Sequence, residues 1–289
     1  MSEPSYAFAA DGLPPQSRLM TGRAVFTEAY AVLPRGTQTA IVTSRLPGWQ
    51  GTRLWVLARP LSGFAETFAH YLMEVAPGGG SSAPEPDPAA QAALFVTAGR
   101  LRLDLAGAAH HLGAGDFAWL PPGAAWQLAA EGDTPARFHW IRKRWQPAAG
   151  LAPPGPVFAS DAGTPPEPMP DCGGVWATTR FTDPEDLRHD MAVTVVTFAP
   201  GGTIPFEETH VMEHGLYVLE GKAVYKLNRD WVEVEAGDYM WLRAFCPQAC
   251  YAGGPGPFRY LLYKDVNRHM PLGGHLGHLG HLGQPGSAG

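Results

Sequence analysis

The chain has 289 residues and a formal net charge of −6. This acidic balance, without any long run of Lys or Arg, argues against nucleic acid or an anionic membrane as the main partner. No segment approaches the roughly 20 apolar residues of a membrane helix, and three cysteines with no recognisable export signal predict reduced thiols in a cytoplasmic protein.

Turn-forming residues are frequent and separate short apolar segments. Glycine and proline number 35 and 29, together about twice their average usage. Such segments, bounded by turns, are typical of all-β sandwiches and barrels. In the first half they occupy 24–34, 38–44, 54–61, 68–77, 94–105, 114–123 and 136–145. The stretch 78–91 is too rich in Pro and Gly for a central strand, and we expect a loop there.

The second half follows a Pro- and Gly-rich segment, 151–170, which we expect to connect two domains. A short helical turn is predicted at 184–189, with Asp183 as its N-cap. Further strand-like segments lie at 191–202, 215–227, 231–242 and 258–266. The tail at 273–289 repeats His-Leu-Gly and is predicted to lack a fold.

The two halves repeat each other. PGGG at 77–80 corresponds to PGGT at 200–203, and Trp119–Leu120 corresponds to Trp241–Leu242. An offset of about 122 residues relates these pairs, and internal repeats of this length indicate duplicated structural units. We therefore predict two copies of one β-barrel, an N-terminal copy in 1–150 and a C-terminal copy in 171–272.

A candidate metal site lies in the second copy. Glu208, His210 and His214 have the spacing E-x-H-x3-H, and Gln248 follows 34 residues after His214. If 208–214 is extended, the period of two places the first three on one face. A carboxylate, two imidazoles and an amide suit Mn²⁺, with Fe²⁺ or Zn²⁺ as alternatives. The loaded site would keep about one positive charge and attract a small anionic substrate.

Three downstream residues could complete an active site. Tyr260 and Lys264 lie four apart in a predicted strand, and Tyr225 lies in another. If these side chains point into the barrel, they could bind a carboxylate and donate a proton to a leaving amine. Without further information, packing or surface placement is the alternative explanation for each. By alternation, Glu207 and Glu213 should point away from the metal.

The first copy lacks the candidate ligands. The offset of about 122 residues places Pro86, Pro88, Ala92 and Trp126 at the four ligand positions. None of these side chains binds a metal. The N-terminal barrel is therefore predicted to be metal-free and to have a structural role.

The motif around the candidate ligands resembles that of the cupin superfamily. Gly202, the three ligand residues and Gly221 occupy the places of the first cupin motif, and Gly237 with Gln248 those of the second. Glu208 stands where the first His is usual, and His214 where the Glu is usual. The resemblance implies an all-β fold of two tandem double-stranded β-helix (jelly-roll) barrels.

A closer resemblance covers roughly 20–272. The segments ETHVMEHGL, GDYMWL, FCPQACY and RYLLYKDVNR are similar to the (S)-ureidoglycine aminohydrolase family of bicupins. This implies that Glu208, His210, His214 and Gln248 bind Mn²⁺. It also implies that Tyr225, Tyr260 and Lys264 serve substrate binding and turnover, with Glu208 and Gln248 next to the substrate.

The implied reaction releases ammonia from (S)-ureidoglycine and yields (S)-ureidoglycolate in allantoin degradation. A homo-oligomer is expected from the same resemblance. Two alternatives stay open: an Fe²⁺-dependent cupin dioxygenase, which would consume oxygen, and a non-catalytic ligand-binding bicupin.

Overall fold

The computed structural model describes residues 23–39, 43–60 and 65–265. This part of the chain is all β apart from one 3-10 helix, η1 (Arg35–Thr37). The all-β prediction is therefore confirmed. The arm 1–22 and the repeat tail 273–289 lie outside the described residues. Within the described ranges, no helix is long and apolar enough to cross a membrane.

The first barrel is built from a sheet with the order β11-β8-β5-β10-β4-β9-β6-β7, in which β3 also pairs with β4. Its strands are β3 (Trp49–Ala58), β4 (Ala69–Ser81), β5 (Ala90–Ala98), β6 (Arg100–Leu105), β7 (Ala108–Gly113), β8 (Asp116–Leu120), β9 (Trp126–Glu131), β10 (Ala136–Arg144) and β11 (Val157–Ser160). The loop expected at 78–91 is shorter than predicted, because β4 continues through the glycines to Ser81 and β5 begins at Ala90.

The second barrel has two facing sheets. The larger has the order β1-β2-β19-β16-β21-β14-β13-β12, and the smaller the order β15-β20-β17-β18. The larger sheet contains β1 (Val25–Phe26), β2 (Tyr30–Leu33), β12 (Glu167–Pro168), β13 (Trp176–Arg180), β14 (Ala192–Phe198), β16 (His214–Glu220), β19 (Tyr239–Leu242) and β21 (Phe258–Lys264). The smaller contains β15 (Thr203–Glu208), β17 (Lys222–Leu227), β18 (Asp230–Glu235) and β20 (Gln248–Ala252).

The repeat is visible strand by strand. β6 begins at Arg100 and β17 at Lys222, 122 residues later, and β7 and β18 have the same offset. Each pair forms the same antiparallel hairpin. The chain therefore contains two β-barrels with the same arrangement of these strands, as the sequence predicted.

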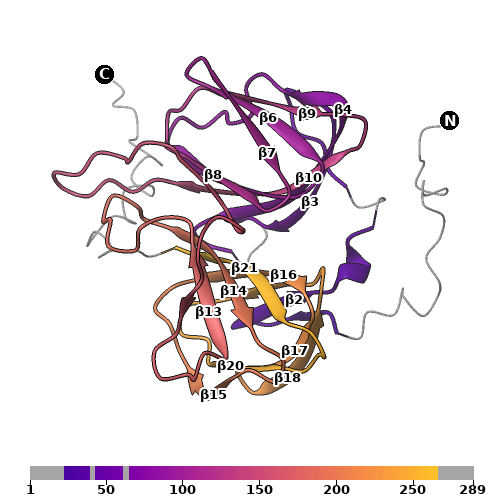
Figure 1. Cartoon of the computed structure of the whole chain (residues 1–289), viewed down its shortest axis with the longest axis vertical. Coiled ribbons are helices and arrows are strands. Elements are labelled where there is room, and N and C mark those ends of the chain that lie inside the picture. The colour runs from indigo at the N-terminus through magenta and orange to yellow at the C-terminus, as the bar shows by residue number, and fades with distance from the viewer. Residues whose placement is uncertain (1–22, 40–42, 61–64, 266–289) are drawn as a thin grey trace, which may run out of the picture.

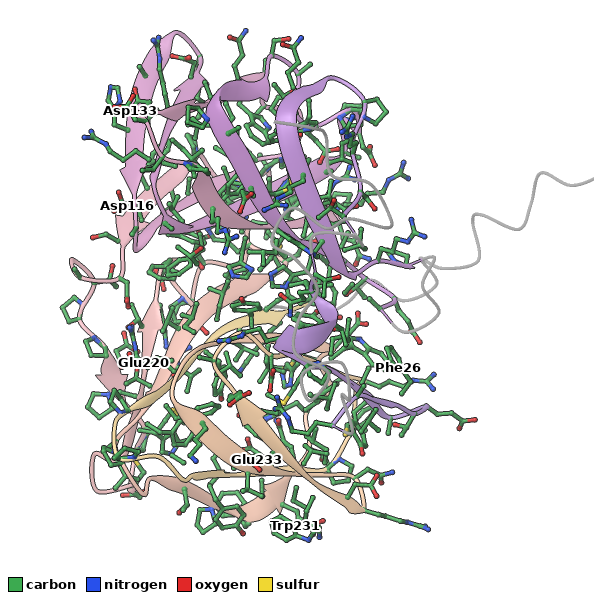
Figure 2. All side chains as sticks on the ribbon, turned by 90° about the vertical axis from the view of Figure 1, so that its right-hand side faces the viewer. Phe26, Asp116, Asp133, Glu220, Trp231 and Glu233 are labelled. Atoms are coloured by element: carbon green, nitrogen blue, oxygen red, sulfur yellow. The ribbon has the colours of Figure 1, made fainter. Side chains whose placement is uncertain are left out.

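The two barrels exchange strands. β2 pairs with β19 of the second barrel, and β11 pairs with β8 of the first. Figure 1 shows the indigo β2 among the orange strands, and Figure 2 shows Phe26 in the same half as Trp231 and Glu233. The predicted boundaries are corrected accordingly: β1 and β2, within 1–150, belong to the second barrel's sheet, and 151–170 contains strands of both sheets.

The predicted helical turn at 184–189 does not form. Two successive turns stand there instead, closed by hydrogen bonds from Asp186 N to Asp183 O and from His189 N to Asp186 O. The Asp183 side chain still accepts a hydrogen bond from Glu185 N at 2.9 Å. The capping residue is therefore present, but no run of helical hydrogen bonds follows it.

The larger sheet of the second barrel is buried on both faces. In β21, Tyr260 and Leu262 face the barrel interior, whereas Leu261 and Tyr263 pack in a cluster that includes residues of the first barrel. This alternation follows from the period of two along a strand. The sheet thus carries the candidate site on one face and the inter-barrel contact on the other.

Candidate metal centre

The four candidate ligands come from separate elements of the second barrel. Glu208 ends β15 and lies opposite Gln248, the first residue of β20. His214 is the first residue of β16. His210 lies between the strands, where its carbonyl accepts a hydrogen bond from Phe245 N at 2.6 Å.

The expected continuous strand through 208–214 is not present. β15 stops at Glu208 and β16 starts at His214, with a bend between them. The ligands therefore converge because two strands and a bend meet at one end of the barrel, rather than through the period of two.

Gly215 allows the strand of His214 to lie close to the first barrel. A Cβ at this position would stand 2.7 Å from Tyr239 Oη and 2.8 Å from the Phe68 ring. Contacts this short do not occur between real side chains. A glycine is thus required beside the candidate ligand, because any larger residue would push β16 away from its neighbours.

A cavity of about 140 Å³ opens at this point. It has room for on the order of five water molecules, so it suits a small ligand. Its walls contain six of the seven predicted site residues: Glu208, His210, His214, Gln248, Tyr260 and Lys264.

Tyr225 is the predicted site residue that the structure places elsewhere. It does not line the cavity, and its side chain is buried in the barrel core. Its ring centroid lies 6.5 Å from that of Tyr260. Tyr225 therefore stands behind Tyr260 as a packing neighbour of a cavity residue.

The donor atoms fit a divalent ion in kind. Glu208 Oε1 lies 3.2 Å from His210 Nε2, and the rings of His210 and His214 are 5.0 Å apart. His214 Nε2 is buried and makes no hydrogen bond within the described part of the chain. A metal ion would give this lone pair a partner.

The side chains are of the right chemical type for a metal ion, but they are not spaced as in a complete metal site. Among residues 23–39, 43–60 and 65–265, no three His, Cys, Asp or Glu side chains already have the mutual arrangement of a complete metal site. Glu208 and His210 instead meet at hydrogen-bonding distance. Binding an ion here would exchange that contact for two bonds to the ion.

Burial sets the protonation of the two basic groups in the cavity. The pKa of His214 is well below its ordinary value because of burial first and then the charges of Lys264 and His210. A neutral imidazole is the form that binds metals. The pKa of Lys264 is also lowered, by burial and by Arg180, while Glu208 acts in the opposite direction.

Tyr260 is held in its neutral form. Burial raises the pKa of its phenol strongly, and the neighbouring Cys250 and Glu208 act in the same direction. Tyr260 can therefore donate a hydrogen bond to a ligand across the whole physiological pH range.

Sequence reasoning missed a second group of polar residues in the cavity wall. Thr178 and Arg180 of β13 and Thr194 of β14 line it, together with Met169 and Trp176. We had not predicted a strand at 176–180. The signal was available: Thr178 and Arg180 occupy alternate positions of one strand, and Thr194 interrupts an apolar run.

Glu207 and Glu213 point away from the cavity, as alternation predicted. Glu207 forms an ion pair with Lys226. Glu213, which precedes His214, is only 5% exposed and reaches toward the first barrel. Neither carboxylate lines the cavity.

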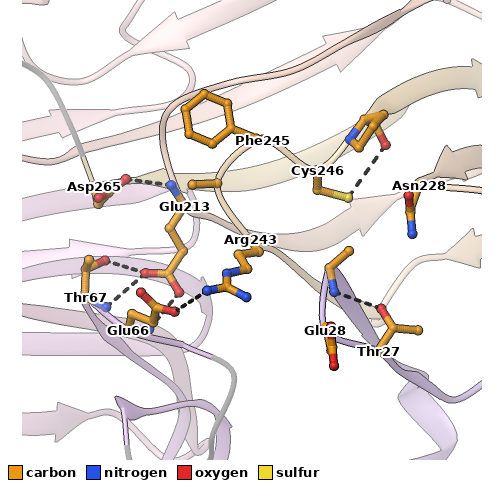
Figure 3. A pocket seen from close by; sticks show the side chains of 13 residues that line it. Thr27, Glu28, Glu66, Thr67, Glu213, Asn228, Arg243, Phe245, Cys246 and Asp265 are labelled. Atoms are coloured by element: carbon orange, nitrogen blue, oxygen red, sulfur yellow. Dashed lines mark hydrogen bonds and ion pairs between the residues drawn. The ribbon is translucent and has the colours of Figure 1, made fainter.

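Glu213 clamps the barrels together, as Figure 3 shows. Its carboxylate accepts hydrogen bonds from Glu66 N at 2.8 Å and from Thr67 N at 2.9 Å. Thr67 Oγ1 and Trp241 Nε1 donate to it as well, each at 2.6 Å. The first barrel thus holds the residue next to His214 through three hydrogen bonds, and Trp241 of β19 in the second barrel adds a fourth.

Apolar side chains occupy two of the corresponding positions in the first barrel. Trp126 and Ala92, at two of the four ligand positions, are buried in its apolar core. Trp126 packs edge-on against Trp140 at 5.9 Å. Nearby, Arg142 forms an ion pair with Glu85. That the first barrel binds no metal stays a prediction.

Comparison with known proteins agrees with the two-barrel fold. A profile of the cupin domain matches residues 71–142 and 194–263, one match in each barrel. The chain is 31% identical over 248 residues to the "Probable (S)-ureidoglycine aminohydrolase" of rice. The aligned region covers 85% of this chain and 76% of the rice protein. This chain belongs to the (S)-ureidoglycine aminohydrolase family of bicupins.

Two further relatives support membership of the family. The (S)-ureidoglycine aminohydrolase of Escherichia coli K12 is 28% identical over 256 residues, covering 88% of this chain and 95% of the relative. The solved structure described as "Putative Glyoxylate Induced Protein" from Pseudomonas aeruginosa is 60% identical, with a TM-score of 0.84, and covers 90% of this chain and 96% of that one. The similarity to all three therefore spans both barrels of the bicupin.

Proposed function

We propose that this member of the family is a Mn²⁺-dependent aminohydrolase that releases ammonia from (S)-ureidoglycine to yield (S)-ureidoglycolate, a step of allantoin degradation. One observation carries the proposal: four side chains of metal-binding type share a small cavity with Lys264 and Tyr260. The names of the relatives supply the substrate.

Glu208, His210, His214 and Gln248 would hold the ion. When bound, Mn²⁺ would supply a positive centre that attracts the substrate's carboxylate and withdraws charge from the groups bound to it. The donor set includes a carboxylate and an amide oxygen and no thiolate, which favours Mn²⁺ over softer metals.

Lys264 and Tyr260 would orient the substrate and move protons. Lys264 can place its amino group beside the carboxylate or the departing amine, and Tyr260 can donate a hydrogen bond because its phenol stays neutral. Held by these two residues and by Glu208, the substrate exposes one face of its central carbon to water. Fixed orientation lowers the entropic barrier and gives one stereoisomer.

The deciding experiment measures ammonia release from freshly generated ureidoglycine by the purified protein. We expect release with added Mn²⁺ and its loss after chelation and gel filtration. Oxygen uptake without ammonia release would indicate a dioxygenase. Saturable binding of the substrate without turnover would indicate a ligand-binding bicupin.

We also propose that the protein self-associates into a homo-oligomer and acts in the cytoplasm. The first part is tested by light scattering of the eluting peak in size-exclusion chromatography, and a monomeric mass at micromolar concentration would contradict it. Fractionation of the source cells tests the second.

A further inference from the structure

Two residues with no assigned role face each other in the cavity wall. Arg180 of β13 and Thr194 of β14 are directly opposed in the antiparallel ladder, and both line the cavity. Residues directly opposed on one face have their Cβ atoms about 5 Å apart. The pair therefore presents a guanidinium and a hydroxyl side by side to any bound ligand.

The Thr194 hydroxyl lacks a partner. Thr194 is 5% exposed, and its Oγ1 makes no hydrogen bond within the described part of the chain. A buried polar group without a partner is destabilising, and native structures that keep one usually have a reason. A ligand in the cavity that carries its own N–H or carbonyl group would satisfy this hydroxyl.

Arg180 is held in place by one nitrogen only. Its Nε lies 3.0 Å from Glu167 Oε2 of β12, and its terminal nitrogens donate no hydrogen bond within the described ranges. Because the guanidinium is planar and rigid, fixing Nε also fixes the direction of the other donors. They remain available for a carbonyl or carboxylate group.

The fold itself does not require this pair. In the first barrel, Val56 and Tyr71 are opposed in the same way. Tyr71 lies opposite Trp140 in the first barrel, and Thr194 lies opposite Leu262 in the second. Trp140 and Leu262 are 122 residues apart, so Tyr71 and Thr194 occupy corresponding places in the two barrels. The same architecture is thus built with no such guanidinium and hydroxyl, which points to a role in binding.

Arg180 and Thr194 also lie apart from Lys264, another residue of the cavity wall. Lys264 is opposite Ala192, two residues from Thr194 along β14, a step of about 7 Å. Arg180 lies one strand farther across the sheet. A ligand whose charged end sits at His214 and Lys264 would extend its other end toward Arg180 and Thr194.

We propose that Arg180 and Thr194 form the subsite that recognises the ureido group of the substrate. The Arg180 guanidinium donates to the ureido carbonyl oxygen, and the Thr194 hydroxyl accepts a hydrogen bond from the terminal amide nitrogen. This inference rests on the proposed function, because it assumes a substrate with a carboxylate at one end and a ureido group at the other.

Three small acids test each contact separately in the Mn²⁺-loaded protein, by titration calorimetry. N-carbamoylglycine carries both the carboxylate and the ureido group. N-acetylglycine keeps the carbonyl but has a methyl group in place of the terminal amide. Glycolate keeps the carboxylate, with a hydroxyl group in place of the ureido group.

We expect Arg180→Gln to weaken binding of N-carbamoylglycine and N-acetylglycine about tenfold or more, and to leave glycolate unchanged. Thr194→Val should weaken N-carbamoylglycine severalfold and spare N-acetylglycine, because a site built for a polar group discriminates against ligands lacking it. Thr194→Ser should restore the parent affinity. In turnover, Arg180→Gln should raise KM for ureidoglycine.

The matched control is Arg259→Gln, since Arg259 is also partly exposed but pairs with Asp161 outside the cavity. Metal content should be equal in all variants. Equal weakening of glycolate and N-carbamoylglycine by Arg180→Gln would overturn the proposal in favour of carboxylate binding. If the parent releases ammonia but Arg180→Gln and Thr194→Val leave the affinities and KM unchanged, the subsite proposal is overturned. A parent protein that neither binds these acids nor releases ammonia would overturn the proposed function itself.

Discussion

His214 and Lys264 lie directly opposite each other in β16 and β21. A proposed metal ligand and a proposed proton donor are therefore cross-strand neighbours in one sheet. His214 is buried and Lys264 is half-buried, and the charge of Lys264 contributes to the lowered pKa of His214. The arrangement favours a neutral imidazole next to an amine, which is the state needed for metal binding on one side and substrate contact on the other.

Replacing Lys264 with Met should abolish most turnover while leaving metal binding intact. Proton transfer by a positioned group contributes about 100-fold to 10,000-fold, so kcat for ammonia release should fall by at least about 100-fold. The control is Lys226→Met, because Lys226 pairs with Glu207 away from the cavity. A wild-type rate in the Lys264 variant would exclude the proposed role.

Two adjacent carboxylates provide a matched test of the metal centre. Glu208→Gln removes the charged ligand, and we expect the affinity for Mn²⁺ to fall on the order of 100-fold or more. Glu207→Gln should keep the parent affinity, because Glu207 does not line the cavity. Calorimetric titration of the chelator-stripped proteins measures both. Equal losses in the two variants would remove Glu208 from the ligand set.

The Glu213 clamp should stabilise the contact between the barrels. Thr67→Val removes the hydroxyl bond to Glu213 at 2.6 Å and a contact with Tyr263 Oη at 2.9 Å. We expect the free energy of unfolding to fall by about 1–3 kcal/mol, measured by urea denaturation. Thr97→Val is the control, since that hydroxyl forms only an exposed bond to Arg137 O. An unchanged urea midpoint in Thr67→Val would show that the clamp does not stabilise the fold.

The buried imidazole pair between the barrels should make the fold sensitive to acid. His70 Nε2 lies 3.0 Å from His139 Nδ1, and both side chains are fully buried. Burial lowers the pKa of His139 to about 3, and that of His70 is lowered as well, by burial and by His139. Between the unfolded value of 6.5 and about 3, the unfolded chain binds protons that the folded chain does not, so stability falls as the pH falls through this range.

Asp265 acts in the opposite direction. Burial raises its pKa to about 6, so its contribution to stability increases as the pH falls from about 6 toward its ordinary value. The test therefore compares variants: melting temperature between pH 7 and pH 4 should fall less steeply in His70→Gln/His139→Gln than in the parent. An identical slope in both proteins would contradict the assignment to the imidazole pair.

Much of the fold could be predicted because a tandem repeat places the same turn signals at a constant spacing. The glycines and the alternating apolar segments report local backbone geometry, which acts over a few residues. The same locality explains why the condition of an extended 208–214 is not met: a bend separates Glu208 from His214, and the residue spacing does not reveal it.

Of the residues proposed for the site from the sequence, all but Tyr225 line the cavity, whereas Thr178, Arg180 and Thr194 of the cavity wall were not predicted. Alternation placed Tyr225 on the inner face of β17, which is correct, but a barrel interior contains both cavity wall and packed core. The distance along the barrel decides between them, and Tyr225 lies in the core behind Tyr260.

The sequence by itself determined the all-β class, the duplication and the group of residues with side chains of metal-binding type, because each depends on residue type and local period. Only the tertiary structure decided that β2 and β11 cross between the barrels, that Glu66 and Thr67 hold Glu213, and that Arg180 faces Thr194. These contacts join segments whose pairing depends on register and on how two sheets pack. A sequence pattern records neither of these, since many registers satisfy the same alternation.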